Sequence, residues 1–169
     1  MSLSYALFPL HPDTPPEGVL LRDYFKGRFD IDKAHARMRG LMDAEGLAFA
    51  PPERMANTRL AQELGKWGEA KAPRIHDALY RANFVEGRAL SQVETLVEVA
   101  REQGLDAAEA ARVLADRAMK DAVDHDWNRA RALGVTGVPT FVAEGRGVVG
   151  AQPYEVLEQL VLAAGAKRR

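Results

Sequence analysis

The sequence predicts an α/β fold in which a long helical segment interrupts a small sheet. Three observations carry this prediction. Residues 5–8 form a short apolar run before a proline-rich stretch, residues 20–133 show helical patterns without strand-like alternation, and residues 139–150 are rich in β-branched residues around a turn. An all-α bundle does not account for the two β-branched segments at the end of the chain.

Capping residues and apolar spacing place the first helices of the block. We expect a helix over residues 32–45, with Asp32 as its N-cap, because a side-chain oxygen at that position accepts an otherwise unpaired amide. Asn57 is expected to cap a further helix that ends near Gly65.

The later helices carry stronger signals. Ser91 and Glu94 have the spacing of a capping box, in which the hydroxyl and the carboxylate each satisfy an early amide. Asp106 begins another helix, and residues 120–133 form the last helix of the block.

The carboxyl-terminal part reads as a hairpin followed by a helix. Residues 139–142 and 147–150 are the expected strands, and Glu144 and Gly145 supply the turn. Pro153 is expected at the first helical position, where its missing N–H costs nothing.

Bulk composition excludes several functions. The chain has 169 residues, 47% of them hydrophobic and 28% charged, which is an ordinary globular balance. A net charge of −1 gives no basic excess for nucleic acid. No signal peptide and no apolar run of about 20 residues is present, so we expect a cytoplasmic protein that does not enter the membrane.

Two residue types bear directly on chemistry. The chain contains no cysteine, which excludes disulfides, thiolate metal sites and a cysteine nucleophile within it. The four histidines are far apart and lack metal-ligand spacing, so neither a metal nor a cofactor is expected.

The most informative stretch is residues 137–141, GVPTF. A proline at the start of a strand cannot donate to a sheet, and the residue before it is pushed toward extended geometry. Together with Gly134 this pattern predicts a tightly bent loop that leads into a strand.

Five segments together resemble a known family. GVTGVPTF and GAQPY resemble the carboxyl-terminal pattern of DsbA-like proteins, which 2-hydroxychromene-2-carboxylate isomerases and kappa-class glutathione transferases share. FPLHPD, NTRLA and ALYRANFVEG resemble segments of its FrnE-like branch. In chain order the five are residues 8–13, 57–61, 78–87, 134–141 and 150–154. The resemblance covers nearly the whole chain from about Tyr5.

The resemblance implies a thioredoxin-like, DsbA-type fold with a large helical insertion. Residues 1–19 and 134–169 would form a partial thioredoxin-like domain, and residues 20–133 the inserted helical domain with a connecting helix. The family's first strand, Cys-x-x-Cys turn and first helix would precede Tyr5 and are not found.

The resemblance also implies a substrate site. In the family the proline matching Pro139 is cis, and the main chain beside it pairs with extended protein or peptide substrates. Gly137, Val138, Pro139 and Thr140 are therefore the expected substrate-binding residues. His11, in the loop after the first expected strand, is expected near the same cleft.

Without the family's first strand, the strands at residues 5–10 and 139–142 would face an empty position in the sheet. Such edges pair readily with other chains. Three arrangements are open: the chain is a fragment, the two strands pair directly, or a second copy completes the sheet as a homodimer.

Three functions remain open on this basis. The chain could be the redox-inactive part of a thiol–disulfide oxidoreductase, or a binding module that uses the edge beside Pro139. It could also be related to glutathione-dependent isomerases and transferases, in which polar residues in the region of Asn57 and Arg59 approach glutathione.

Overall fold

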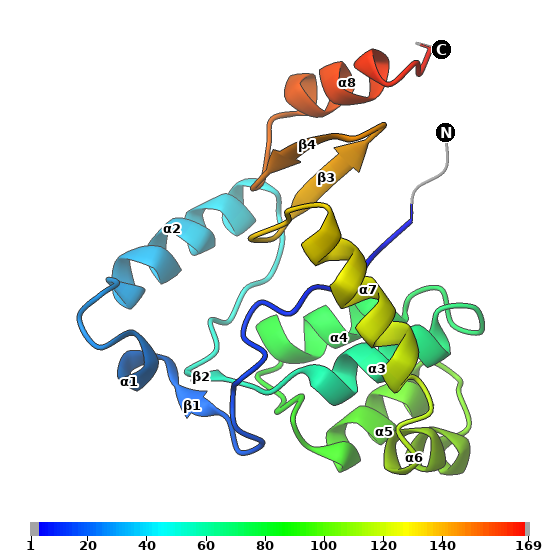
Figure 1. Ribbon diagram of the computed structural model, residues 1–169. Coiled ribbons are helices and arrows are strands. Elements are labelled where there is room, and N and C mark those ends of the chain that lie inside the picture. Colours follow the sequence, from blue (N-terminus) through cyan, green and yellow to red (C-terminus); the bar gives the residue numbers. More distant parts are fainter. Residues whose placement is uncertain (1–3, 168–169) are drawn as a thin grey trace. The chain divides into compact units, whose positions relative to one another are not determined.

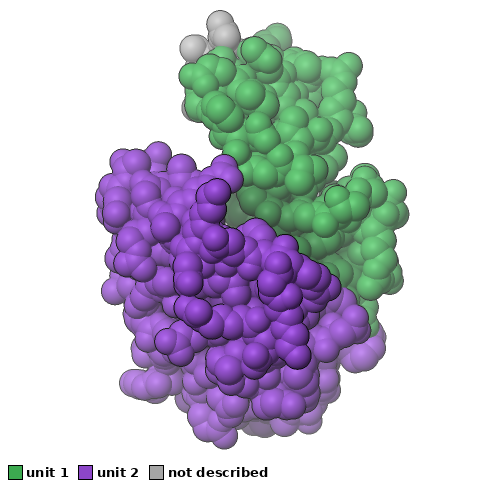
Figure 2. Space-filling view, turned by 90° about the vertical axis from the view of Figure 1, so that its left-hand side faces the viewer, with its two compact units in different colours: residues 1–10, 123–169 green, residues 11–122 purple. Residues whose placement is uncertain are grey.

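The computed structural model describes residues 4–167 and divides the chain into two compact units. Residues 11–122 form the helical unit, and residues 1–10 with 123–169 form the sheet unit (Figure 2). These units are defined by compactness alone, so the predicted domain boundaries stay predictions.

Four helices build the core of the helical unit (Figure 1): α3 Arg59–Gly68, α4 Ile75–Phe84, α5 Val93–Glu102 and α6 Ala107–Ala115. Their apolar faces meet in one cluster, whose largest fully buried apolar side chains are Leu64, Ile75, Leu96, Val99 and Leu114. Burial of this apolar surface is the main favourable contribution to the stability of the unit.

The helix start expected at Asp106 is confirmed, and two expected caps are corrected. Asp106 caps α6, accepting from the Glu109 amide at 2.6 Å. Asn57 accepts the Arg59 amide at 3.0 Å, but Thr58 occupies the N-cap position of α3, which continues to Gly68. The predicted capping box is wrong, because the turn that ends at Gln92 makes that residue the N-cap of α5 and leaves Ser91 one position too early.

A helical arm leaves this core through a short ladder. β1 (Val19–Leu20) pairs antiparallel with β2 (Arg54–Met55), in a segment where no strand was predicted. Two-residue strands have too short an alternation to detect in a sequence. The arm contains α1 (Leu21–Phe25) and α2 (Ile31–Ala44), and neither helix has a buried residue.

The N-cap of α2 is Asp30, whose carboxylate accepts from the Lys33 amide at 2.9 Å, so the expected cap at Asp32 is wrong. Both aspartates stand before a helical pattern. The extended main chain at Asp30 decides between them, because an N-cap residue needs non-helical φ and ψ.

The sheet unit contains most of α7 (Lys120–Ala132), the hairpin β3 (Thr140–Ala143) and β4 (Arg146–Val149), and α8 (Tyr154–Ala163). α8 packs on both strands of the hairpin (Figure 1). The predicted hairpin and its turn are confirmed, with the strand bounds shifted by one residue. Pro153 is the N-cap of α8 rather than its first residue.

The strand predicted near the amino terminus is wrong. Residues 4–10 form no strand, and β3 pairs only with β4 within residues 4–167. Instead, the Leu7 amide donates to the buried carboxylate of Asp126 on α7 at 3.1 Å. An apolar run becomes a strand only when a neighbouring strand takes its amides. The direct pairing with residues 139–142, one of the three arrangements left open, does not occur.

No helix within residues 4–167 is long and apolar enough to cross a membrane. The finding concerns membrane-spanning helices alone, and the cytoplasmic location stays a prediction.

Candidate functional site

The loop that carries the predicted substrate-binding residues begins at a well-defined helix end. After α7, Gly134 adopts a left-handed conformation with φ +68°. Its amide donates to the Arg131 carbonyl at 2.9 Å, and the Val135 amide donates to the Ala130 carbonyl at 3.0 Å. This pair of bonds is a Schellman motif, which ends the helix and directs the chain toward β3.

Hydrogen bonds on both sides of Pro139 hold the loop. The Thr140 hydroxyl donates to the Gly137 carbonyl at 2.6 Å, and the Gly150 amide donates to the Pro139 carbonyl at 2.7 Å. The Val138–Pro139 peptide bond is cis. Four predicted residues therefore lie in one ordered loop at the start of β3.

The Gly150–Pro139 bond determines which side of β3 faces outward. In an antiparallel pair, successive residues point their N–H and C=O groups to opposite sides. Pro139 points toward β4, so Phe141 and Ala143 do as well, whereas Thr140 and Val142 point away from it. Within the described part of the chain, no main-chain hydrogen bond to another segment occupies this outer edge.

The side chains along this edge differ between the two faces of the hairpin. Phe141, Ala143 and Val148 are half-buried, whereas Val142 and Val149 on the opposite face are 44% and 56% exposed. Val138, just before the strand, is 50% exposed. The outer edge therefore combines unpaired main-chain groups with exposed apolar side chains.

His11, the fifth predicted site residue, belongs to the helical unit. Its Nδ1 lies 3.3 Å from the Tyr24 hydroxyl, and the two rings meet edge to face with centroids 5.3 Å apart. Burial lowers the pKa of His11 below its ordinary value, because the charged imidazolium loses hydration. The structure thus gives His11 an aromatic environment within the helical unit, and its place near the cleft stays a prediction.

Asn57 and Arg59 are engaged in structural contacts. Asn57 donates to the Thr14 carbonyl at 2.6 Å, and Arg59 bonds Glu63 at 2.7 Å and the Lys120 carbonyl at 2.8 Å. These contacts favour a structural role over glutathione binding, because the polar atoms already have partners.

Glu63 is the centre of a cluster that the sequence did not reveal. Its side chain is fully buried and also accepts two bonds from Arg117, at 2.7 and 2.9 Å. Burial raises its pKa, but the hydrogen bonds and charges of Arg117 and Arg59 outweigh that and hold the pKa below its usual range. The Arg59–Glu63 spacing of four residues was visible, whereas the contact with Arg117 is tertiary.

Within residues 4–167 no group of three or more acidic or histidine side chains could hold a metal ion. The sequence also has no cysteine. The outward main-chain groups of Thr140 and Val142 are suited to binding through main-chain pairing.

The hairpin, the covering helix and the loop before β3 fit an α/β protein of the thioredoxin-like class with extensive helical content. The family model described as a DSBA-like thioredoxin domain matches residues 1–162. The chain belongs to this family, which confirms the predicted family and fold class.

Two solved structures show the similarity in three dimensions. The crystal structure of a probable DsbA oxidoreductase from Streptomyces coelicolor is 34% identical, with a TM-score of 0.80 over 95% of this chain and 74% of that chain. A structure of 2-hydroxychromene-2-carboxylate isomerase is 22% identical, with a TM-score of 0.66 over 80% of this chain and 66% of that one, and shows the fold alone. No curated protein matches the sequence.

Proposed function

We propose that this chain binds extended polypeptide segments along the outer edge of β3 and performs no thiol–disulfide exchange by itself. The observation that carries the proposal is the outward direction of the Thr140 and Val142 main-chain groups, next to the loop of Pro139. An extended segment that adds to such an edge gains main-chain hydrogen bonds and needs little sequence specificity.

Exposed apolar side chains add to this binding. Val138 and Val142 flank the edge and are about half exposed. A bound segment with apolar residues at alternate positions would cover them, because side chains of a strand alternate between its faces. Unfolded proteins expose segments of this kind, so an unfolded protein is the proposed substrate class.

The absence of exchange follows from the residue types. One similar solved structure is named a probable DsbA oxidoreductase. Membership of this chain in the FrnE-like branch of the DsbA family is part of this proposal. Thiol–disulfide exchange needs an attacking thiolate, and the chain has no cysteine. We therefore propose that any redox step would take its thiols from outside residues 1–169.

A binding titration with proline variants tests the edge. Val142→Pro removes an outward N–H and places the ring where an added strand would lie, while the bonds to β4 stay intact. Val149→Pro is the matched control, because Val149 points outward on β4 and its carbonyl accepts from the Gln152 side chain at 2.6 Å.

With a fluorescently labelled, reduced and alkylated protein as probe, anisotropy should show about tenfold weaker binding for Val142→Pro and little change for Val149→Pro. Equal binding by both variants and the original chain would refute the site. If the original chain binds no probe but dimerises, and Val142→Pro abolishes the dimer, a second copy rather than substrate completes the sheet.

A further inference from the structure

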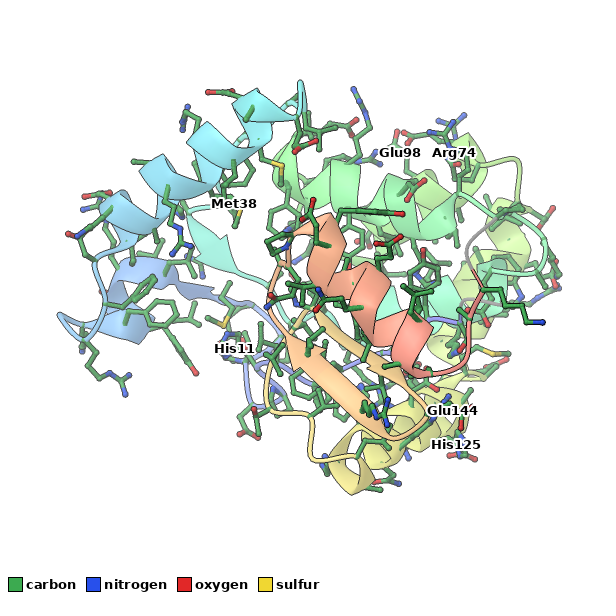
Figure 3. The ribbon with its side chains drawn as sticks, turned by 90° about the horizontal axis from the view of Figure 1, so that it is seen from above. His11, Met38, Arg74, Glu98, His125 and Glu144 are labelled. Carbon is green, nitrogen blue, oxygen red and sulfur yellow. The ribbon has the colours of Figure 1, made fainter. Side chains whose placement is uncertain are left out.

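The α1–α2 arm, residues 21–45, has no buried residue. Its longer helix exposes apolar side chains, with Met38 at 41% and Leu41 at 52% (Figure 3 labels Met38). A helix normally gains its stability by packing an apolar face on the protein, and isolated helices of this length are marginal in water. Packing a partner against the exposed apolar face of α2 would therefore stabilise this helix.

Basic side chains flank this face on both sides. Arg37 lies one turn before Leu41, and Arg39 lies one turn before Met42, on the other side of the apolar stripe. Lys33 precedes Arg37 by a further turn. None of these three cations has an acidic partner within residues 4–167. A partner for the arm should be apolar with acidic borders.

The same chain carries a surface of that kind. Between α5 and α6 lies a shallow depression of about 500 Å³, whose apolar lining is Val93, Val97 and Ala111. The polar residues around it are Glu94, Glu98 and Arg101. The depression thus offers an apolar floor to the Met38–Leu41 face of α2.

The charge around the depression is negative. Two carboxylates line it, Glu94 and Glu98, against the one guanidinium group of Arg101, which pairs with Glu98 at 3.7 Å. Arg88 binds Glu98 at 3.1 Å and Glu102 at 3.0 Å, which leaves Glu94 without a described partner. The excess negative charge complements the cations of the arm.

The arm does not fill the depression of its own chain. Figure 1 shows α2 at one end of the helical unit and α5 with α6 at the other. We propose that the α1–α2 arm of one copy docks in the α5–α6 depression of a second copy. The contact joins two different surfaces of the same chain, so it is heterologous. Two copies can each dock their arm in the other, or each copy can dock its arm in the next one along a row. This proposal is independent of polypeptide binding at β3.

Two charge-altered variants test the contact. The arm variant carries Arg37→Glu and Arg39→Glu. The groove variant carries Glu94→Lys and Ala111→Arg, which reverses one border charge and fills the depression. Arg74→Glu, at an exposed cation outside both surfaces, is the matched control. Circular dichroism of each variant checks that the helical content equals that of the original chain.

Sedimentation velocity at micromolar concentration should show self-association of the original chain, of Arg74→Glu and of Val142→Pro, weakened by high salt. Each double variant should be monomeric alone. Their mixture should form a 1:1 complex, because the intact arm of one fits the intact depression of the other. A monomeric original chain, or a mixture that stays monomeric, would overturn the proposal.

Discussion

The main-chain amide of Gly150 lies 2.7 Å from the carbonyl oxygen of Pro139, and this bond closes the open end of the β3–β4 hairpin. It determines that Thr140 and Val142 direct their N–H and C=O groups away from β4. The same directions follow from the register of β3 with β4, and the bond extends that pairing one position beyond both strands.

Replacing Gly150 by alanine should weaken this arrangement. Gly150 has φ +89°, a conformation that costs a residue with a Cβ atom about 1–2 kcal/mol. Thermal unfolding of Gly150→Ala should show a lower midpoint, and probe binding at β3 should weaken in parallel. Gly137→Ala is the control, since no atom lies within 4 Å of its added Cβ and its φ is not left-handed. Equal loss of stability in both variants would contradict this explanation.

Glu63→Gln should destabilise the helical unit. The substitution leaves two guanidinium groups without their shared carboxylate, which for a buried pair costs about 3–5 kcal/mol. Arg117 is 43% exposed, so water solvates part of its charge and reduces this cost. We expect the free energy of unfolding to fall by about 2–3 kcal/mol. Urea unfolding followed by circular dichroism measures it. Asp32→Asn breaks an exposed ion pair and should cost less than about 1 kcal/mol.

The Glu63 cluster also predicts a pH dependence. The folded protein holds the pKa of Glu63 below the ordinary value of 4.5. As pH falls below that value, the unfolded chain takes up the proton first, so the stabilisation is present above it and is lost as pH approaches the folded pKa. The difference in urea midpoint between the original chain and Glu63→Gln should shrink as pH falls from about 5 toward 3. A constant difference would show that Glu63 does not titrate in this range.

The chain should not catalyse disulfide reduction. Turbidity of insulin with dithiothreitol should rise no faster with the protein than without it, because the sequence offers no thiolate. A heat-denatured sample controls for nonspecific effects on precipitation. Clear acceleration by the native chain alone would contradict the proposed redox inactivity.

Local signals allowed much of the fold to be predicted. The turn at Glu144 and Gly145 has two left-handed residues, with φ of 48° and 74°, which suits the twist of a two-residue hairpin. The cap at Asp106 was equally local. The amino-terminal run failed as a strand because pairing depends on a neighbour, and Asp126 took the amide of Leu7 instead.

In the candidate site, too, local features could be predicted from the sequence and tertiary contacts could not. Residues 137–140 form one continuous segment, so a sequence pattern was enough to locate this loop, while its role in binding stays a prediction. The outward direction of Val142 required the register with β4, and the Glu63–Arg117 contact joins residues 54 positions apart. Contacts of that separation leave no periodic pattern in a sequence.

Amide-resolved hydrogen exchange in the presence of a reduced and alkylated protein tests the binding edge most directly. If a polypeptide adds to β3, exchange at the Thr140 and Val142 amides should slow, while the Phe141 and Ala143 amides, already directed toward β4, should change little. Slowed exchange confined to other parts of the chain, with Thr140 and Val142 unchanged, would contradict polypeptide binding at this edge.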